Sequence, residues 1–148
     1  MTIPDFNENG TLPSGMFSVS WEEFEARFGI NHRRKQLING LKRAVSEFRS
    51  AGGKTLYLDG SFVTNKKNPD DFDACYSPNE LNPDKLDPTL LDCTKAGRQK
   101  QKVKYEGEFF PGTIPADMVG TRYIDFFQKD KRTGLPKGII ILNIEVEP

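Results

Sequence analysis

Residues 56–76 have the sequence LYLDGSFVTNKKNPDDFDACY, and this stretch decides the fold of the chain. Apolar residues alternate with others on both sides of a polar centre, which predicts strands over 55–59 and 71–76 around a Gly-Ser turn. Side chains of a strand point alternately to opposite faces, so Asp71 and Asp73 should share a face. The sequence therefore predicts a strand pair that presents two carboxylates beside a turn.

Two carboxylates on one face repel each other unless a cation lies between them. A hard divalent cation, Mg²⁺ or Mn²⁺, is a suitable partner because it prefers oxygen ligands and tolerates bound phosphate. Gly60 has no Cβ atom, so its backbone can approach a ligand closely, and successive N–H groups in such a turn can bind an anion. A helical turn over 61–66 would point its first amides at the same anion. A phosphate-binding turn followed by a metal-binding acid pair indicates a nucleotide site.

This motif resembles the signature of the nucleotidyltransferase superfamily. Gly60-Ser61 is followed by a polar spacer that ends in Asn-Pro-Asp and then by Asp71, Phe72 and Asp73. Minimal nucleotidyltransferases are similar in order and spacing. The whole chain also resembles an uncharacterised nucleotidyltransferase-like family of bacteria and their mobile elements. The segments that carry this second resemblance are Leu-Asp-Gly-Ser-Phe-Val-Thr at 58–64, Gly-Glu-Phe-Phe-Pro at 107–111 and Phe-Phe-Gln-Lys-Asp at 126–130.

The resemblance implies a nucleotidyltransferase-like core, an α/β (α+β) single domain with helices packed on a mixed sheet. It implies transfer of a nucleotidyl group from a nucleoside triphosphate to a hydroxyl of a protein or RNA acceptor. Asp71 and Asp73 would hold the metal, and a later strand would supply a third carboxylate. Glu108 is the candidate for this acid, and Glu106 is its rival because both fall on one face of a strand predicted over 103–110. The nucleotide would be bound by Gly60, Ser61, Lys66 and Lys67.

Two departures from the superfamily pattern leave the activity open. The residue before the glycine is normally apolar, whereas this chain has Asp59. Lys66 and Lys67 stand in the spacer where minimal nucleotidyltransferases commonly carry an arginine. Such proteins often form half of a toxin–antitoxin or phage-defence pair, so a cognate toxin or antitoxin is a further expected partner. The alternative is a catalytically inactive module that acts by protein–protein interaction or binds RNA through the basic stretch 95–104.

Length and composition predict one soluble domain, since 148 residues are enough for a sizeable core. Lys and Arg total 21, as do Asp and Glu, so no overall positive field favours nucleic acid. The single histidine, His32, lies outside the motif, which argues against histidine-based catalysis. Cys75 and Cys93 form no Cys-x-x-Cys motif and follow no signal peptide, so we expect a cytoplasmic protein. No apolar run is long enough to span a membrane.

The first half of the chain carries clear helix signals. An extended arm over 1–19 is expected to precede a domain over 20–148. A capping box at Ser20 predicts a short helix to about residue 28. Asn31 would cap a second helix, which ends at a Gly-Gly pair.

The second helix, predicted over 32–50, has an apolar stripe at helical spacing. Its charged residues, Arg34 among them, are expected mostly on other faces. They form either a nucleic-acid surface or a solvated surface, and the solvated surface is the simpler interpretation.

The second half of the chain is predicted to contain three more strands, over 103–110, 123–128 and 138–146. The last of them is nearly continuously apolar, which places it in the interior of the sheet. The stretch before the first of them is the most basic in the chain. Phe126 and Phe127 are either core residues or a stacking platform for a base.

Overall fold

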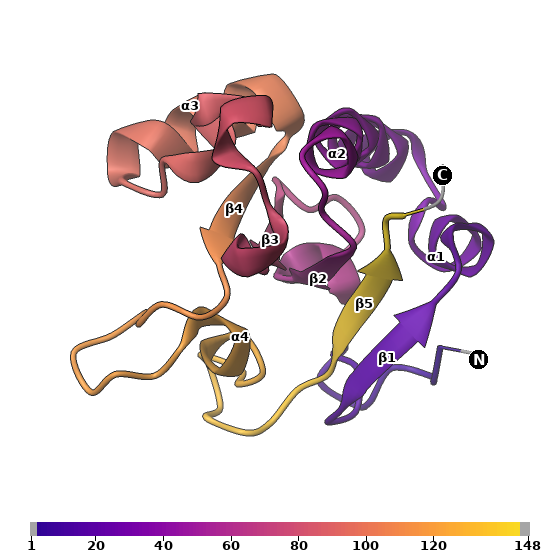
Figure 1. The fold of residues 1–148 in the computed structure, drawn as a ribbon. Coiled ribbons are helices and arrows are strands. Elements are labelled where there is room, and N and C mark those ends of the chain that lie inside the picture. Colours follow the sequence, from indigo (N-terminus) through magenta and orange to yellow (C-terminus); the bar gives the residue numbers. More distant parts are fainter. Residues whose placement is uncertain (1–2, 146–148) are drawn as a thin grey trace.

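Five strands form one mixed sheet, in the order β1-β5-β2-β3-β4, in a computed structural model that describes residues 3–145 (Figure 1). The strands are β1 (Met16–Val19), β2 (Thr55–Asp59), β3 (Phe72–Tyr76), β4 (Gly107–Pro111) and β5 (Ile139–Asn143). The α-helices are α1 (Trp21–Phe28), α2 (His32–Ser50), α3 (Lys95–Tyr105) and α4 (Tyr123–Phe126). The 3₁₀ helices are η1 (Ser61–Val63), η2 (Pro78–Glu80), η3 (Pro83–Lys85) and η4 (Pro88–Leu91). The predicted single α+β domain with a mixed sheet is confirmed.

Strand directions bring four strand ends to one edge of the sheet. β2 runs antiparallel to β3 and β5, whereas β3 is parallel to β4 and β1 is parallel to β5. The carboxyl end of β2 therefore lies beside the amino ends of β3, β4 and β5. Asp59 is opposite Asp73 in the β2–β3 pair, and Glu108 is opposite Asp73 in the β3–β4 pair. These three residues define what we call the acidic edge.

Local signals set the first two helices as predicted. Ser20 Oγ accepts a hydrogen bond from Glu23 N (3.1 Å), and Asn31 Oδ1 accepts one from Arg34 N (2.9 Å). Each bond satisfies an amide that has no partner within its own helix. After α2 the chain turns at Gly52, whose φ of +96° suits glycine.

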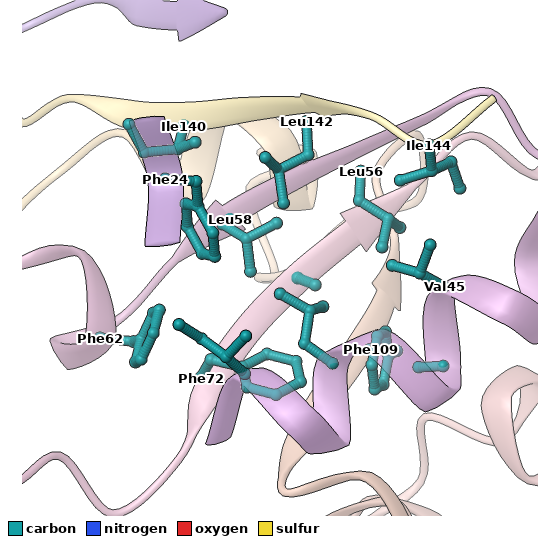
Figure 2. Close-up of a cluster of buried hydrophobic side chains, with 14 of the residues drawn as sticks. Phe24, Val45, Leu56, Leu58, Phe62, Phe72, Phe109, Ile140, Leu142 and Ile144 are labelled. Atoms are coloured by element: carbon teal, nitrogen blue, oxygen red, sulfur yellow. The ribbon is translucent and has the colours of Figure 1, made fainter. Parts of the chain in front are cut away.

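The main hydrophobic core lies between the sheet and helices α1 and α2, and Figure 2 shows its side chains. Leu58, Phe72 and Phe109 come from three neighbouring strands and are fully buried. Val45 of α2 and Phe24 of α1 meet them from the helical side and are also fully buried. Burial of each such side chain stabilises the fold by about 2 kcal/mol. The core faces of β2, β3 and α2 are those that the sequence periodicity predicts.

Helix α4 covers the opposite face of the sheet through a second, smaller cluster. Cys75 and Phe110 are buried there with Phe127, whose ring centroid lies 5.3 Å from that of Phe110. Burial raises the pKa of the Cys75 thiol, which is a free cysteine. Cys75 therefore acts as a packing residue.

The strand predicted over 103–110 is wrong in its first half. Residues 95–105 form α3, which Thr94 caps by accepting a hydrogen bond from Gly97 N (3.2 Å). The buried side of this helix has one residue per turn: Gly97, Gln101 and Tyr105. Only Tyr105 is a large hydrophobic side chain, whereas Gly97 is small and Gln101 polar, so apolar periodicity does not detect this side of the helix. Val103, which supported the predicted alternation, is 85% exposed.

The strand predicted over 123–128 is also wrong, because Tyr123–Phe126 form α4. Tyr123 and Phe127 stack with their ring centroids 5.9 Å apart. A helical turn brings both rings onto Phe110, at 4.6 and 5.3 Å, which an extended chain would not do. The last predicted strand is confirmed as β5 in the interior of the sheet, and residue 146 lies outside the described residues.

The extended arm predicted over 1–19 ends in β1, which joins the sheet as an edge strand beside β5. Leu12 of the arm is fully buried, and Phe6 and Phe17 pack partly against the core. Met16, by contrast, is 50% exposed and adds little to this anchoring. The arm is thus both an anchored segment and part of the sheet.

Candidate functional site

The turn after β2 brings the backbone against a carboxylate. Gly60 has φ +83° and ψ −168°, a conformation that L side chains rarely adopt. A Cβ atom at Gly60 would lie 2.6 Å from Asp73 Oδ2, which is closer than real contacts allow. Both the backbone and the approach of Asp73 therefore require glycine. The helical turn predicted over 61–66 exists only as the shorter η1, which starts at Ser61.

A buried arginine holds the loop that follows this turn. Arg34 of α2 is 1% exposed. Its guanidinium donates hydrogen bonds to the carbonyl oxygens of Phe62 (2.6 Å), Thr64 (2.8 Å) and Lys66 (2.7 Å). Three fixed carbonyls give the loop a defined shape. The sequence analysis did not predict the burial of Arg34. Its position one turn before Leu37, on the apolar stripe of α2, indicates that burial.

Two carboxylates oppose each other at the acidic edge. Asp59 is 2% exposed, and neither of its oxygens makes a hydrogen bond of ordinary geometry with the described residues. Lys137 Nζ lies 3.2 Å from Asp59 Oδ1 as an ion pair. Burial raises the pKa of Asp59 to about 6, against the opposing effect of Lys137. Burial and the charges of Asp71, Asp59 and Glu108 raise the pKa of Asp73 to about 7.

The other two predicted metal ligands have cationic partners on α3. Lys102 Nζ lies 3.2 Å from Asp71 Oδ2 and 3.4 Å from Glu108 Oε1. Arg98 Nε lies 3.0 Å from Glu108 Oε2. Glu108 occupies the same face as Asp73 on the neighbouring strand, as the sequence predicts. Two cations of the basic stretch are therefore engaged within the chain.

Glu106 is not the alternative third acid, and the prediction that it shares a face with Glu108 is wrong. It caps α3 with φ 69°, the left-handed conformation, and does not belong to β4. Glu106 Oε2 lies 3.5 Å from Arg33 Nη1 on α2. The alternation fails because residue 106 lies in a helix cap, where side chains do not follow strand parity.

A cavity of about 630 Å³ opens beside the Gly60 turn, a volume typical of small-ligand sites. Its walls come from the N-terminal arm, the turn after β2, the start of β3 and the segment 126–137. Five cationic side chains line it: Lys66, Lys129, Lys131, Arg132 and Lys137. Three carboxylates line it: Asp59, Asp73 and Asp130. The mixture favours an anionic ligand with an acid at one wall.

The structure brings only part of the predicted site to this cavity. Among the predicted nucleotide-binding residues, the cavity is lined by Gly60, Ser61 and Lys66, whereas Lys67 is exposed away from the lining. Asp73 lines the cavity, but Asp71 and Glu108 lie outside its lining, next to α3. Phe126 and Phe127 line the cavity and also pack in the second cluster, so core packing and ligand contact are compatible.

Residues 4–143 match the model of a family of unknown function, DUF6932. The chain belongs to the DUF6932 family. No curated protein and no solved structure matches this DUF6932 chain. Within residues 3–145, no helix of the DUF6932 protein combines the length and apolar character needed to cross a membrane.

The acids of this DUF6932 site fit a hard divalent cation that also binds phosphate. Among residues 3–145, no three His, Cys, Asp or Glu side chains are close enough to hold a metal ion alone. Mg²⁺ in nucleotide sites typically takes one or two carboxylates together with substrate phosphates and water, so no cage of three is needed. Asp73 faces the cavity, and burial first and then the charges of Asp71, Asp59 and Glu108 raise its pKa. Asp71 and Glu108 are the adjacent carboxylates, and Lys102 and Arg98 of α3 balance their charges.

Proposed function

We propose that this chain is a metal-dependent nucleotidyltransferase that transfers a nucleotidyl group from a nucleoside triphosphate to a hydroxyl of a protein or RNA acceptor. The observation that carries the proposal is the close approach of Gly60 to Asp73 at one wall of the cavity. A phosphate bound at the turn would lie beside the carboxylate proposed to hold the metal. The five cations in the same cavity suit the charge of a triphosphate.

Each predicted residue has a distinct role in this proposal. Asp73, with Asp71 and Glu108, would hold Mg²⁺ or Mn²⁺, which would neutralise charge on the triphosphate and align the attacking oxygen. Gly60 and Ser61 would bind phosphate oxygens through main-chain amides and the hydroxyl. Binding through both flanking acids requires Lys102, which now bridges them, to release its ion pairs.

Lysines of the spacer and the buried arginine support the same site. Lys66 would add positive charge at the cavity wall, whereas Lys67 would reach only a ligand that extends beyond the cavity. Arg34 would keep the loop in shape through its carbonyl contacts, without touching the ligand. A carboxylate of the acid set would accept the proton of the attacking hydroxyl, whose oxygen bonds to the α-phosphorus while the bond to the leaving pyrophosphate breaks.

Labelling tests this proposal directly. The protein is incubated with each labelled nucleoside triphosphate, Mg²⁺ and either bulk RNA or cell lysate. The wild type should label an acceptor, Asp73→Asn should abolish the label, and Ser61→Ala should weaken it less because main-chain amides still bind the phosphates. Asp70→Asn, at an exposed position just before the acid pair, is the matched control. Equal labelling by wild type and Asp73→Asn would refute the assigned role.

A second candidate, a catalytically inactive module that acts by binding a protein or RNA, is favoured by one observation. Lys102 and Arg98 already neutralise Asp71 and Glu108, so the flanking acids are satisfied without a metal ion. A wild type that labels nothing with any of the four nucleotides, and copurifies with one defined protein, would support the module and exclude the enzyme.

The cellular setting also belongs to the proposal. Cys75 and Cys93 are both free, which suits the reducing cytoplasm. The partner we propose there is a cognate toxin or antitoxin, or another component of a phage-defence system. Copurification with the neighbouring gene product, compared between wild type and Asp73→Asn, would show whether that partner depends on the active site.

A further inference from the structure

The segment between α4 and β5 forms an ordered hairpin at the cavity, which we call the 128–137 hairpin. Main-chain hydrogen bonds join Lys137 N to Gln128 O and Asp130 N to Leu135 O, both at 2.8 Å. Asp130 is 6% exposed, and its Oδ1 accepts a hydrogen bond from Arg132 N (2.9 Å). These bonds hold the tip of the hairpin in a defined shape. Its cationic side chains are therefore presented to the cavity from a fixed backbone.

Lys131 is, with Lys129, one of two exposed lysines of this hairpin that line the cavity without an ion pair among residues 3–145. Lys131 lines the same cavity as Asp59 and Asp73, and its positive charge lowers the pKa of both acids slightly against the larger effect of burial. Arg132, by contrast, is engaged with Asp130 Oδ2 at 3.3 Å.

Lys137 is held at the inner wall of the cavity by Asp59. The side chain of Lys137 is 15% exposed and that of Asp59 is 3% exposed, so the ion pair is largely shielded from water. Asp59 makes no hydrogen bond of ordinary geometry within the described chain, and Lys137 is its nearest cation. An ammonium group has three donors, so Lys137 keeps others for a ligand beside Gly60. Burial of the Asp59 carboxylate is costly, and the ion pair with Lys137 offsets part of that cost while it holds the lysine in place.

We propose that the 128–137 hairpin is a polyphosphate clamp, in which Lys131 and Lys137 bind phosphate oxygens and Asp59 positions Lys137. The inference rests on the cavity of the proposed function and names the chain's own cations for the phosphate end. The ligand is a linear polyphosphate group, either part of a nucleoside triphosphate or inorganic. The clamp explains why this chain has Asp59 before Gly60, where the resemblance leads us to expect an apolar residue. The hairpin and the Gly60 turn line the same cavity, so both would contact the same phosphates.

Calorimetric titration with sodium tripolyphosphate, ATP and adenosine tests the clamp, with chelator present and at low ionic strength. The wild type should bind tripolyphosphate and ATP but not adenosine. Lys131→Gln and Lys137→Gln should each weaken binding about tenfold, since each removes one charge-assisted contact. Lys85→Gln, at an exposed position in η3, is the matched control and should bind as the wild type does. Wild-type affinity in both hairpin variants would overturn the clamp.

The positioning role of Asp59 has its own readout. Asp59→Asn alone should weaken tripolyphosphate binding. The double variant Asp59→Asn, Lys137→Gln should bind no more weakly than Lys137→Gln alone, because the acid acts through the lysine. Additive losses would overturn this role. Circular dichroism of each variant checks that the fold is kept, and Lys131→Gln tests the clamp even if Asp59→Asn fails to fold.

The two proposals fail separately. Lysine-dependent tripolyphosphate binding by a protein that labels no acceptor would support the clamp and refute nucleotidyl transfer. Labelling that requires Asp73 but is unchanged in Lys131→Gln and Lys137→Gln would refute the clamp and leave the transferase in place. ATP binding without tripolyphosphate binding would also overturn the clamp, because it would show recognition through the nucleoside.

Discussion

Asp73→Asn should stabilise the ligand-free protein at alkaline pH, because the ionised carboxylate is crowded and buried. The pKa of Asp73 rises from an ordinary value of 3.8 to about 7, first through burial and then through Asp71, Asp59 and Glu108. A folded-state pKa above the unfolded one means that the unfolded chain loses its proton first. Stability is therefore greatest below the unfolded pKa and falls as pH rises toward the folded pKa.

The magnitude follows from the size of this shift. One pKa unit corresponds to about 1.4 kcal/mol, so ionised Asp73 costs up to ~4 kcal/mol at pH 8. At pH 5 the same group costs about 2 kcal/mol, because it is still protonated in the folded state. The stability gained by Asp73→Asn should therefore be larger at pH 8 than at pH 5 by roughly 2–3 kcal/mol. These values are upper limits, since neighbouring side chains rearrange around the charge.

Urea denaturation of wild type and variant at pH 5, 6, 7 and 8 measures this difference. Asp70→Asn controls for the loss of one carboxylate from an exposed site on the same segment. A stability difference between wild type and Asp73→Asn that is constant from pH 5 to pH 8 would refute the crowding. Loss of labelling together with a gain in stability would show that this acid is retained for function at the expense of the fold.

Two further substitutions test the construction of the turn and its loop. Gly60→Ala should destabilise the protein by about 2 kcal/mol or more, because the new methyl group meets Asp73 and the backbone is strained at positive φ. Gly134→Ala is the control: φ is +72° there but nothing lies within 4 Å, so the loss of stability should be only about 1 kcal/mol. Equal losses in denaturation would contradict the steric argument. Arg34→Lys should cost about 3 kcal/mol and speed amide exchange over 62–67, because one ammonium cannot satisfy the carbonyls that the guanidinium binds. Arg43→Lys is the control, because the Arg43 side chain makes one exposed hydrogen bond, to the Lys104 carbonyl of α3. Unchanged amide exchange over 62–67 in Arg34→Lys would contradict the role of Arg34 in holding the loop.

Elements whose signals are local could be predicted from the chain alone. The caps at Ser20 and Asn31, the apolar stripe of α2 and the alternation of β2 and β3 each lie within a few residues of the structure that they specify. Periodicity failed for α3 because its buried side consists of Gly97, Gln101 and Tyr105. The Gln101 side chain is buried because Nε2 donates to Thr89 O (3.0 Å) and Oε1 accepts from Phe109 N (2.8 Å), and no hydrophobic pattern encodes such bonds.

In the candidate site, too, local features were predictable from the sequence and long-range contacts were not. The sequence alone determined that Gly60 and Asp73 belong to one strand–turn–strand unit, because the turn signal and the alternation of the strands are local. The structure supplied the register that places Asp59 opposite Asp73, since the connection over 60–71 is too long for the turn to fix it. Only the tertiary structure decided that Lys137 pairs with Asp59, that Lys102 bridges Asp71 and Glu108, and that Arg34 supports the loop. Each of these contacts joins elements far apart in the chain, where charge pairing depends on the packing of whole helices and strands. A basic stretch looks alike in sequence whether it faces solvent, a ligand or the protein's own acids.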